Sequence, residues 1–99
     1  MADEIIHQTT RLKIMAALNA LPTGSLLEFL RLKTLADTTD GNLAVHLATL
    51  EEAGYVAIKK DFVGKKPRTR VAITRRGREA LARHIAYLRG ILNLDGTDQ

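Results

Sequence analysis

The chain has 99 residues, 45% of them hydrophobic and 26% charged, which is typical of a single globular domain over residues 1–99. It contains no cysteine, which excludes disulfides, thiolate metal ligands and cysteine nucleophiles. No apolar run approaches the roughly 18 residues of a membrane span, and the acidic start MADEIIHQTT lacks the basic beginning of a signal peptide. These features predict a cytoplasmic protein without contact to a membrane.

The formal net charge of +4 is distributed unevenly along the chain. Residues 1–53 have a net charge of −3, because 4 basic side chains face 7 acidic ones. Residues 54–92 carry 11 basic side chains against 2 acidic ones, a net charge of +9. One strongly cationic half in a small domain indicates a polyanion as partner, and nucleic acid is the usual one. The alternative is a basic surface that serves only solubility.

The first predicted helix begins at about Thr9 or Thr10 and ends at Ala20, before Pro22 and Gly24. Its apolar side chains recur at i, i+3, i+4 and i+7, the spacing of an amphipathic helix. They are Ile14, Ala17, Leu18 and Leu21.

Residues 25–28 are ambiguous, since Ser25 and Glu28 have the spacing of a capping box but the segment also suits a short extended piece. A short helix from about Phe29 to Ala36 follows in either case. The turn-rich DTTDG and a helix over about residues 40–53 then complete a helix-turn-helix pattern. This helix is expected to be capped by Thr38 or Thr39, to bury Leu43, Leu47 and Leu50, and to end at Gly54.

After Gly54 the apolar period changes from 3.6 to 2, which predicts two strands. Apolar and polar residues alternate in YVAIKKDF and in RTRVAIT, and the segment VGKKP between them predicts a turn. The result is a hairpin with a cationic tip, whose basic part covers about residues 59–70. Residues that would meet phosphates or a minor groove are Lys65, Lys66, Arg68 and Arg70.

A long closing helix is expected over about residues 75–93, capped by Thr74. Its leucine and isoleucine residues step by 4, 3 and 4, a heptad-like spacing that favours a second copy of the chain as partner. They are Leu81, Ile85, Leu88 and Leu92.

The element order helix, short helix, turn, helix, basic hairpin, helix is that of an α+β winged helix-turn-helix, with a three-helix core and its core residues within 8–80. The stretch TDGNLAVHLATLEEAGYVAIKKDFVGKKPRTRVAITRRGREAL resembles the compact winged-helix transcription regulators related to the MarR and ArsR families. The resemblance covers about residues 8–92. It implies a homodimeric regulator of transcription that binds palindromic double-stranded DNA.

Two departures from better-known members bear on ligands. Metal-sensing members use cysteine or clustered histidine, whereas this chain has no cysteine and its three histidines, His7, His46 and His84, are far apart in the sequence. No metal and no cofactor are therefore expected. Drug-sensing members carry longer helical arms around an effector pocket, so a small-molecule effector stays open for a chain of this length.

The helix over about residues 40–53 is expected to lie in the major groove with its N-terminal part on base edges. A helical projection centred on Leu47 points Val45 and Thr49 outward. An asparagine can bond adenine bidentately, and apolar side chains can touch a thymine methyl. The predicted contacts are Thr39, Gly41, Asn42, Val45, His46 and Thr49.

Two other functions compete with DNA binding. This helix has no Lys or Arg and ends in Glu51 and Glu52, which favours a winged-helix module that binds protein and no specific DNA sequence. An enzyme is not expected, because the chain has no glycine-rich phosphate loop, nucleophile elbow or paired catalytic motif.

Overall fold

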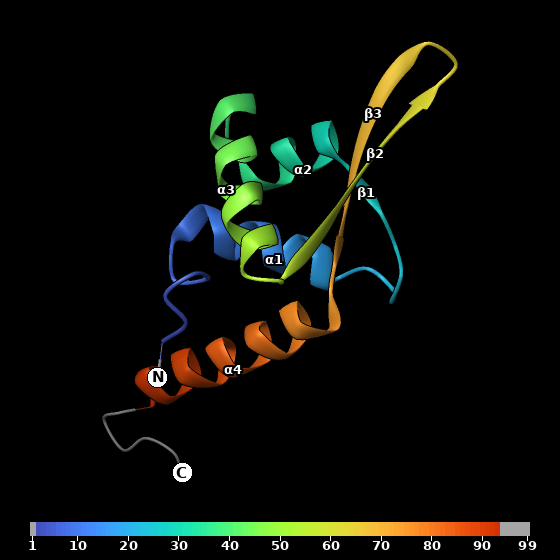
Figure 1. Cartoon of the computed structure of the whole chain (residues 1–99). Helices are drawn as coiled ribbons and strands as arrows, with labels where there is room; N and C mark the ends of the chain where they lie inside the picture. Colours follow the sequence, from blue (N-terminus) through green and yellow to red (C-terminus); the bar gives the residue numbers. More distant parts are fainter. Residues whose placement is uncertain (1, 94–99) are drawn as a thin grey trace.

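The computed structural model describes residues 2–93, and Figure 1 shows them as a cluster of helices from which a long hairpin projects. The helices are α1 (Thr9–Asn19), α2 (Phe29–Ala36), α3 (Asp40–Glu52) and α4 (Arg75–Leu92). The strands are β1 (Leu27–Glu28), β2 (Val56–Val63) and β3 (Lys66–Ile73). The element order confirms the predicted α+β winged helix-turn-helix.

Side-chain caps explain where the longer helices begin. The Thr39 hydroxyl accepts a hydrogen bond from the backbone N–H of Asn42 at 3.2 Å, so Thr39, and not Thr38, caps α3. Thr74 caps α4 in the same way by accepting from the N–H of Gly77 at 3.0 Å. The predicted stop of α3 is also confirmed, since Gly54 has a φ of +82°, which glycine adopts without strain.

The segment before α2 takes the extended alternative. β1 pairs antiparallel with β3, with Leu27 opposite Val71 and Glu28 opposite Arg70, so the sheet order is β1-β3-β2. Glu28 is the N-cap residue of α2 and makes no side-chain capping bond. The capping-box spacing with Ser25 was therefore misleading, because sheet pairing places Leu27 next to the buried Val71.

β2 and β3 form the wing, a ribbon in continuous register from the pair Val56–Ile73 to the pair Val63–Lys66. Gly64 and Lys65 form the two-residue turn, and the φ of +63° at Gly64 suits the first central position of such a turn. Pro67 faces Phe62 near the tip, beyond the reach of β1, so no neighbouring strand needs its missing N–H.

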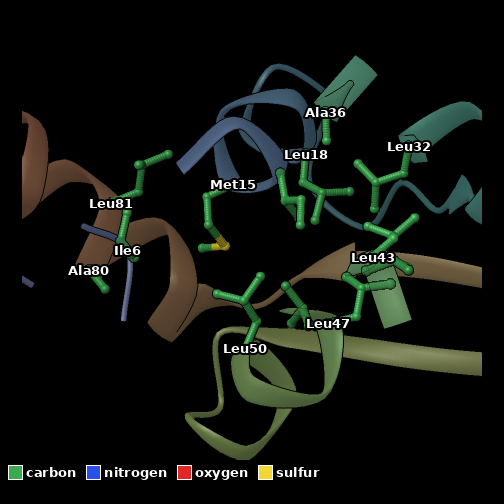
Figure 2. Packing of buried hydrophobic residues seen from close by; sticks show 13 residues of the cluster. Ile6, Met15, Leu18, Leu32, Ala36, Leu43, Leu47, Leu50, Ala80 and Leu81 are labelled. Atoms are coloured by element: carbon green, nitrogen blue, oxygen red, sulfur yellow. The ribbon is translucent and has the colours of Figure 1, made fainter. Parts of the chain in front are cut away.

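The core lies between the helices and the inner half of the wing, and Figure 2 shows its side chains converging from all of these elements. α3 contributes the three predicted leucines, Leu43, Leu47 and Leu50, each at most 2% exposed. Val56 and Val71 from the wing close the cluster on one side. The outer half of the wing takes no part in this core, which is why it projects in Figure 1.

The N-terminal segment also belongs to the core, which the sequence did not indicate. Ile6 is fully buried, and the Asp3 carboxylate accepts hydrogen bonds from the backbone N–H groups of Ile5 and Ile6 and from the Tyr55 hydroxyl at 2.7 Å. Burial raises the pKa of the Asp3 carboxyl, but these hydrogen bonds outweigh it and lower the pKa overall. Asp3 thus fastens the start of the chain to the end of α3.

α4 corrects one expectation about the predicted seam. Leu81 is only 1% exposed and packs in the core of its own chain, so it is not available to a second chain. α4 packs against α1, and the side of its first half from Gly77 to His84 is buried. In residues 2–93 no helix combines the length and the apolar character that crossing a bilayer requires.

Candidate nucleic-acid interface

The outward side of α3 presents the side chains that the helical projection selected. Val45 is 65% exposed, and Gly41 and Asn42 are also exposed, while Thr49 is half-buried. The Thr49 hydroxyl donates to the carbonyl of Val45 at 3.3 Å, so its proton is used within the helix. Among residues 2–93, none forms a hydrogen bond with the Asn42 side-chain amide, which is therefore free to bind an external group.

His46 has a partner that the sequence did not reveal. Its Nδ1 lies 3.1 Å from a guanidinium nitrogen of Arg11 on α1. Since a guanidinium can only donate, Nδ1 accepts, and the neutral ring carries its proton on Nε2. Burial and then the charge of Arg11 lower the pKa of His46, so the neutral form prevails at pH 7. The alternative of a hydrogen bond within the fold is thus confirmed for Nδ1, and a contact of Nε2–H with DNA stays a prediction.

At the N-terminus of α3, neither the space nor the backbone conformation at Gly41 requires a glycine. A Cβ at Gly41 would meet no heavy atom within 4 Å, and Gly41 does not have a positive φ. Asp40 beside it pairs with Lys33 of α2 at 2.8 Å, which ties the two helices of the helix-turn-helix together. Gly41 is thus dispensable for the free fold, and its small size matters only if something outside the chain approaches closely.

A groove of about 310 Å³ separates α3 from the wing. Ala44 and Ala48 line it from α3, and Lys60 and Thr69 line it from the wing. The strand register defines the wing face that looks toward α3, because the partners on that face are Ile58 with Val71, Lys60 with Thr69, and Phe62 with Pro67. The groove therefore has a helix without Lys or Arg on one side, with Glu51 in its lining, and a ribbon that contributes Lys60 on the other.

The wing exposes four lysines whose charge is not neutralised within the described part of the chain. They are Lys59, Lys60, Lys65 and Lys66, all exposed, and no carboxylate of residues 2–93 lies within 4.0 Å of their ammonium groups. Lys65 and Lys66 lie at and beside the turn, at the far end of the ribbon in Figure 1. Exposed, unpaired lysines at a projecting tip suit contacts with phosphates.

The two wing arginines differ from those lysines, because a carboxylate of the wing already binds them. Asp61 accepts from Arg68 at 2.9 and 2.8 Å, in bidentate geometry, and from Arg70 at 3.0 Å. The hydrogen bond from Arg68 lowers the pKa of the Asp61 carboxyl to about 2. Register places these three residues on the wing face opposite the groove. The alternation of the strands contained this information, but the neutralising role of Asp61 was missed.

The arginines at the start of α4 are also mostly accounted for. Arg78 donates to the backbone carbonyls of Asn19 and Leu21 at 3.1 and 2.9 Å, and so satisfies the C-terminal end of α1. Arg75 pairs with Glu79 at 3.3 Å on the surface. An external anion is not needed to explain why Arg78 stands at a helix N-terminus.

The fold brings two of the three histidines together, although they are distant in the sequence. The rings of His7 and His84 lie 6.1 Å apart, and Nδ1 of His84 accepts from the backbone N–H of Asp3 at 3.2 Å. Residues 2–93 contain no group of three or more potential ligands that could hold a metal ion. The buried His84 has a structural partner in the N-terminal segment.

The remaining seam residues lie on the outer part of α4. Ile85 packs partly against the core and Leu88 is half-buried, while Leu92 is 77% exposed and its neighbour Ile91 44% exposed. No residue of the described chain from 85 onward in α4 is buried, in contrast to the first half of the helix. The second half therefore presents apolar surface that its own chain leaves uncovered.

Known proteins share this architecture. Residues 10–92 match the family model of the winged helix DNA-binding domain. An uncharacterized protein of Methanocaldococcus jannaschii is 39% identical over 82 residues, which are 83% of this chain and 86% of the relative. A transcriptional regulator homologue from Pyrococcus horikoshii OT3 has a TM-score of 0.80 at 32% identity, covering 98% of this chain and 91% of that one.

More distant structures share the fold alone. A MarR family transcriptional regulator from Silicibacter pomeroyi has a TM-score of 0.69 at 22% identity, covering 97% of this chain and 62% of that one. The family model matches most of the chain, and the helix-turn-helix, the wing and the closing helix all lie within the matched residues. The chain is thus a member of the winged helix DNA-binding domain family.

Proposed function

We propose that this protein is a homodimeric, sequence-specific transcriptional regulator, with α3 in the major groove and the wing on the adjacent backbone. The observation that carries the proposal is the combination of an exposed helix side that has no Lys or Arg with a neighbouring wing that carries four unpaired lysines. Contacts to phosphate position a protein on DNA, whereas contacts to base edges specify the sequence. α3 matches the task of reading bases, and the wing matches the task of binding phosphates. We place this regulator in the cytoplasm, as the sequence analysis expected.

On α3 the proposed base contacts are Asn42, Val45 and the Nε2–H of His46. The amide of Asn42 can bond adenine, the exposed Val45 can touch a thymine methyl, and an imidazole N–H can donate to an acceptor on a base edge. Thr39, Gly41 and Thr49 line the same side and complete the surface. The cap residue Thr39 and the small Gly41 allow the helix N-terminus to approach a phosphate, where its dipole favours an anion.

On the wing the proposed phosphate contacts are Lys65 and Lys66, supported by the exposed Lys59 and Lys60. Arg68 and Arg70 are secondary, since Asp61 already neutralises part of their charge. Their guanidinium groups can reach DNA only by exchanging Asp61 for a phosphate. The electrostatic attraction of the wing therefore comes mainly from the lysines.

The homodimer rests on the second half of α4. Leu88, Ile91 and Leu92 offer apolar surface there, with Ile85 at its inner edge. Two protomers joined along this surface would present two α3 helices to half-sites one turn of DNA, about 34 Å, apart. The palindromic operator follows from the twofold symmetry of such a dimer.

Leu88→Glu tests the dimer, because a charge in the apolar surface opposes association. Light scattering is expected to give twice the monomer mass for the unmodified chain and the monomer mass for Leu88→Glu. Arg75→Glu, at a side chain that is 93% exposed at the other end of α4, is the matched control and is expected to leave the mass unchanged. A Leu88→Glu chain that stays dimeric would place the interface elsewhere.

Selection of bound sequences from random duplex DNA tests the function itself. A palindromic motif with half-site centres about 10 base pairs apart is the expected result. Recovery of duplex without any preferred sequence would reduce the function to non-specific binding. The absence of binding to any duplex at 50 mM salt would favour the second candidate, a protein-binding winged helix, which the absence of Lys and Arg from α3 supports.

A further inference from the structure

The wing carries an apolar ridge that no part of the described chain covers. Phe62 on β2 is 68% exposed and stands opposite the exposed Pro67 on β3. Both belong to the wing face that looks toward α3 and lines the groove. Large apolar side chains that are exposed at a projecting tip cost solvation free energy in the free protein, so the ridge indicates contact with a binding partner.

The charges around the ridge favour a polyanion. Lys60 precedes Phe62 on the same face, and Lys65 and Lys66 lie at the adjoining turn. Asp61, the acid closest in sequence, points to the other face and is bound by Arg68 and Arg70. Glu51 lies deeper, where it lines the inner groove on α3 and accepts from the N–H of Ile58 at 3.4 Å. On the β3 side Glu28 lines a pocket together with Pro67 and Thr69, so the cations border the strip at Lys60 and at the turn.

The reach of the ridge agrees with the spacing of grooves in DNA. A strand advances about 3.3 Å per residue, so Phe62 lies about 13 Å beyond Ile58, whose backbone N–H meets Glu51 at the end of α3, and about 7 Å beyond Lys60, where the lining of the groove ends. In B-DNA the minor groove lies about half of a 34 Å turn from the centre of the major groove, roughly 17 Å. A helix in the major groove would thus hold the ridge over the neighbouring minor groove.

We propose that Phe62 and Pro67 enter the minor groove next to the site of α3 and pack against its deoxyribose walls. The inference rests on the proposed function and adds to it a non-electrostatic contact. Phenylalanine and proline are among the side chains that minor-groove proteins use as apolar wedges. The lysines hold the phosphates on both sides of the groove, and the ridge fills the space between them. The wing then senses the width of the groove as well as its charge.

Phe62→Ala tests the ridge, with Val63→Ala as the matched control. Val63 is the next residue, 56% exposed, and its register partner Lys66 places it on the opposite face of the same ribbon. The probe is the duplex recovered by selection, with the dissociation constant measured by fluorescence anisotropy between 50 and 200 mM salt. Phe62→Ala is expected to weaken binding about tenfold, the lower end of what burying a phenylalanine contributes.

The dependence on salt separates the ridge from the lysines. Phe62 carries no charge, so Phe62→Ala should leave the slope of log affinity against log salt unchanged. Val63→Ala should stay within about twofold of the unmodified chain, and Phe62→Leu should recover most of the loss since leucine also buries apolar area. Thermal unfolding of all three variants checks that the hairpin is intact, as expected for exposed positions.

Inosine in place of guanine under the wing identifies the groove, because it removes only the amino group that guanine presents in the minor groove. This exchange should strengthen binding of the unmodified chain more than that of Phe62→Ala. Equal losses for Phe62→Ala and Val63→Ala, or no loss for either, would overturn the ridge while leaving DNA binding in place. A Phe62→Ala chain that binds DNA normally but changes its mass in light scattering would assign the ridge to protein contacts instead. Failure of the unmodified chain to bind any duplex would reject the proposed function itself.

Discussion

α3 and the wing face each other across one groove and yet differ in every property that matters for DNA. α3 has no lysine or arginine and exposes a valine and an asparagine, whereas the wing exposes four unpaired lysines. α3 is fixed by three core leucines, while the outer wing contributes nothing to the core. In the proposed function, a helix without Lys or Arg reads the bases and a projecting cationic wing binds the phosphates, so specificity and affinity lie on separate elements.

Gly77→Ala is expected to have the largest effect, because at this residue the start of α4 packs directly against Tyr55, in the link between α3 and β2. A Cβ there would lie 2.1 Å from the carbonyl oxygen of Tyr55, a backbone atom that also accepts the N–H of Thr74. We expect a loss of about 3 kcal/mol in the free energy of unfolding, measured with urea. Gly90→Ala in the same helix is the control, since its Cβ meets nothing within 4 Å, and it should gain up to about 1 kcal/mol. Equal stability of the two variants would contradict the close approach.

Asn42→Ala removes a proposed reader from α3 and leaves the charge of the protein unchanged. The expected result is a relaxed preference at one base position in each half-site, with a loss of about 1–3 kcal/mol for the preferred base. The salt slope should not move, because no phosphate contact is lost. A repeated selection from random DNA measures the preference, and an unaltered motif would remove Asn42 from the readers.

Replacing Lys65 and Lys66 together by alanine tests the opposite element. Each phosphate contact contributes about −0.9 to the slope of log affinity against log salt, so the variant should flatten it by about 1.8 per protomer. The base preference should stay the same. Anisotropy titrations at several salt concentrations measure the slope, and a changed motif with an unchanged slope would reverse the roles assigned to wing and helix.

Asp61→Asn is expected to have the smallest effect and to act in the other direction. The carboxylate restrains Arg68 and Arg70, so its loss should tighten binding to any duplex and steepen the salt slope by up to about 0.9 for each arginine released. Glu79→Gln, which releases only the exposed Arg75, is the control. An unaltered slope for Asp61→Asn would show that the arginines do not reach DNA even when free.

The pH dependence of the Asp61 contacts follows from the same geometry. The pKa of this carboxyl is lowered from 3.8 to about 2, so its contribution to stability is present above about pH 4 and is lost as the pH falls through 2. The clamp on the arginines therefore stays closed over the whole range in which DNA binding is measured. A change in affinity between pH 5 and 8 must come from another group.

The sequence by itself determined the element order, the buried face of α3 and the alternation of the wing, because these depend on local periodicity and on caps and turns. Thr39, Thr74 and Gly54 act within a few residues of their own position, so their roles are readable from the chain. The sequence also showed the difference in net charge between the two halves, since this requires only a count of basic and acidic residues.

Only the tertiary structure decided which predicted site residues are free. His46 meets Arg11 35 positions away, so this partner does not follow from local pattern. Arg68 and Arg70 meet Asp61 within one hairpin, where the alternation of the strands puts them on one face but only the exact register brings them together. Leu81 fits a seam by spacing, but in the fold it packs in the core of its own chain, on the buried side of α4. Periodicity shows which side of an element is apolar, whereas what covers that side depends on contacts between distant segments.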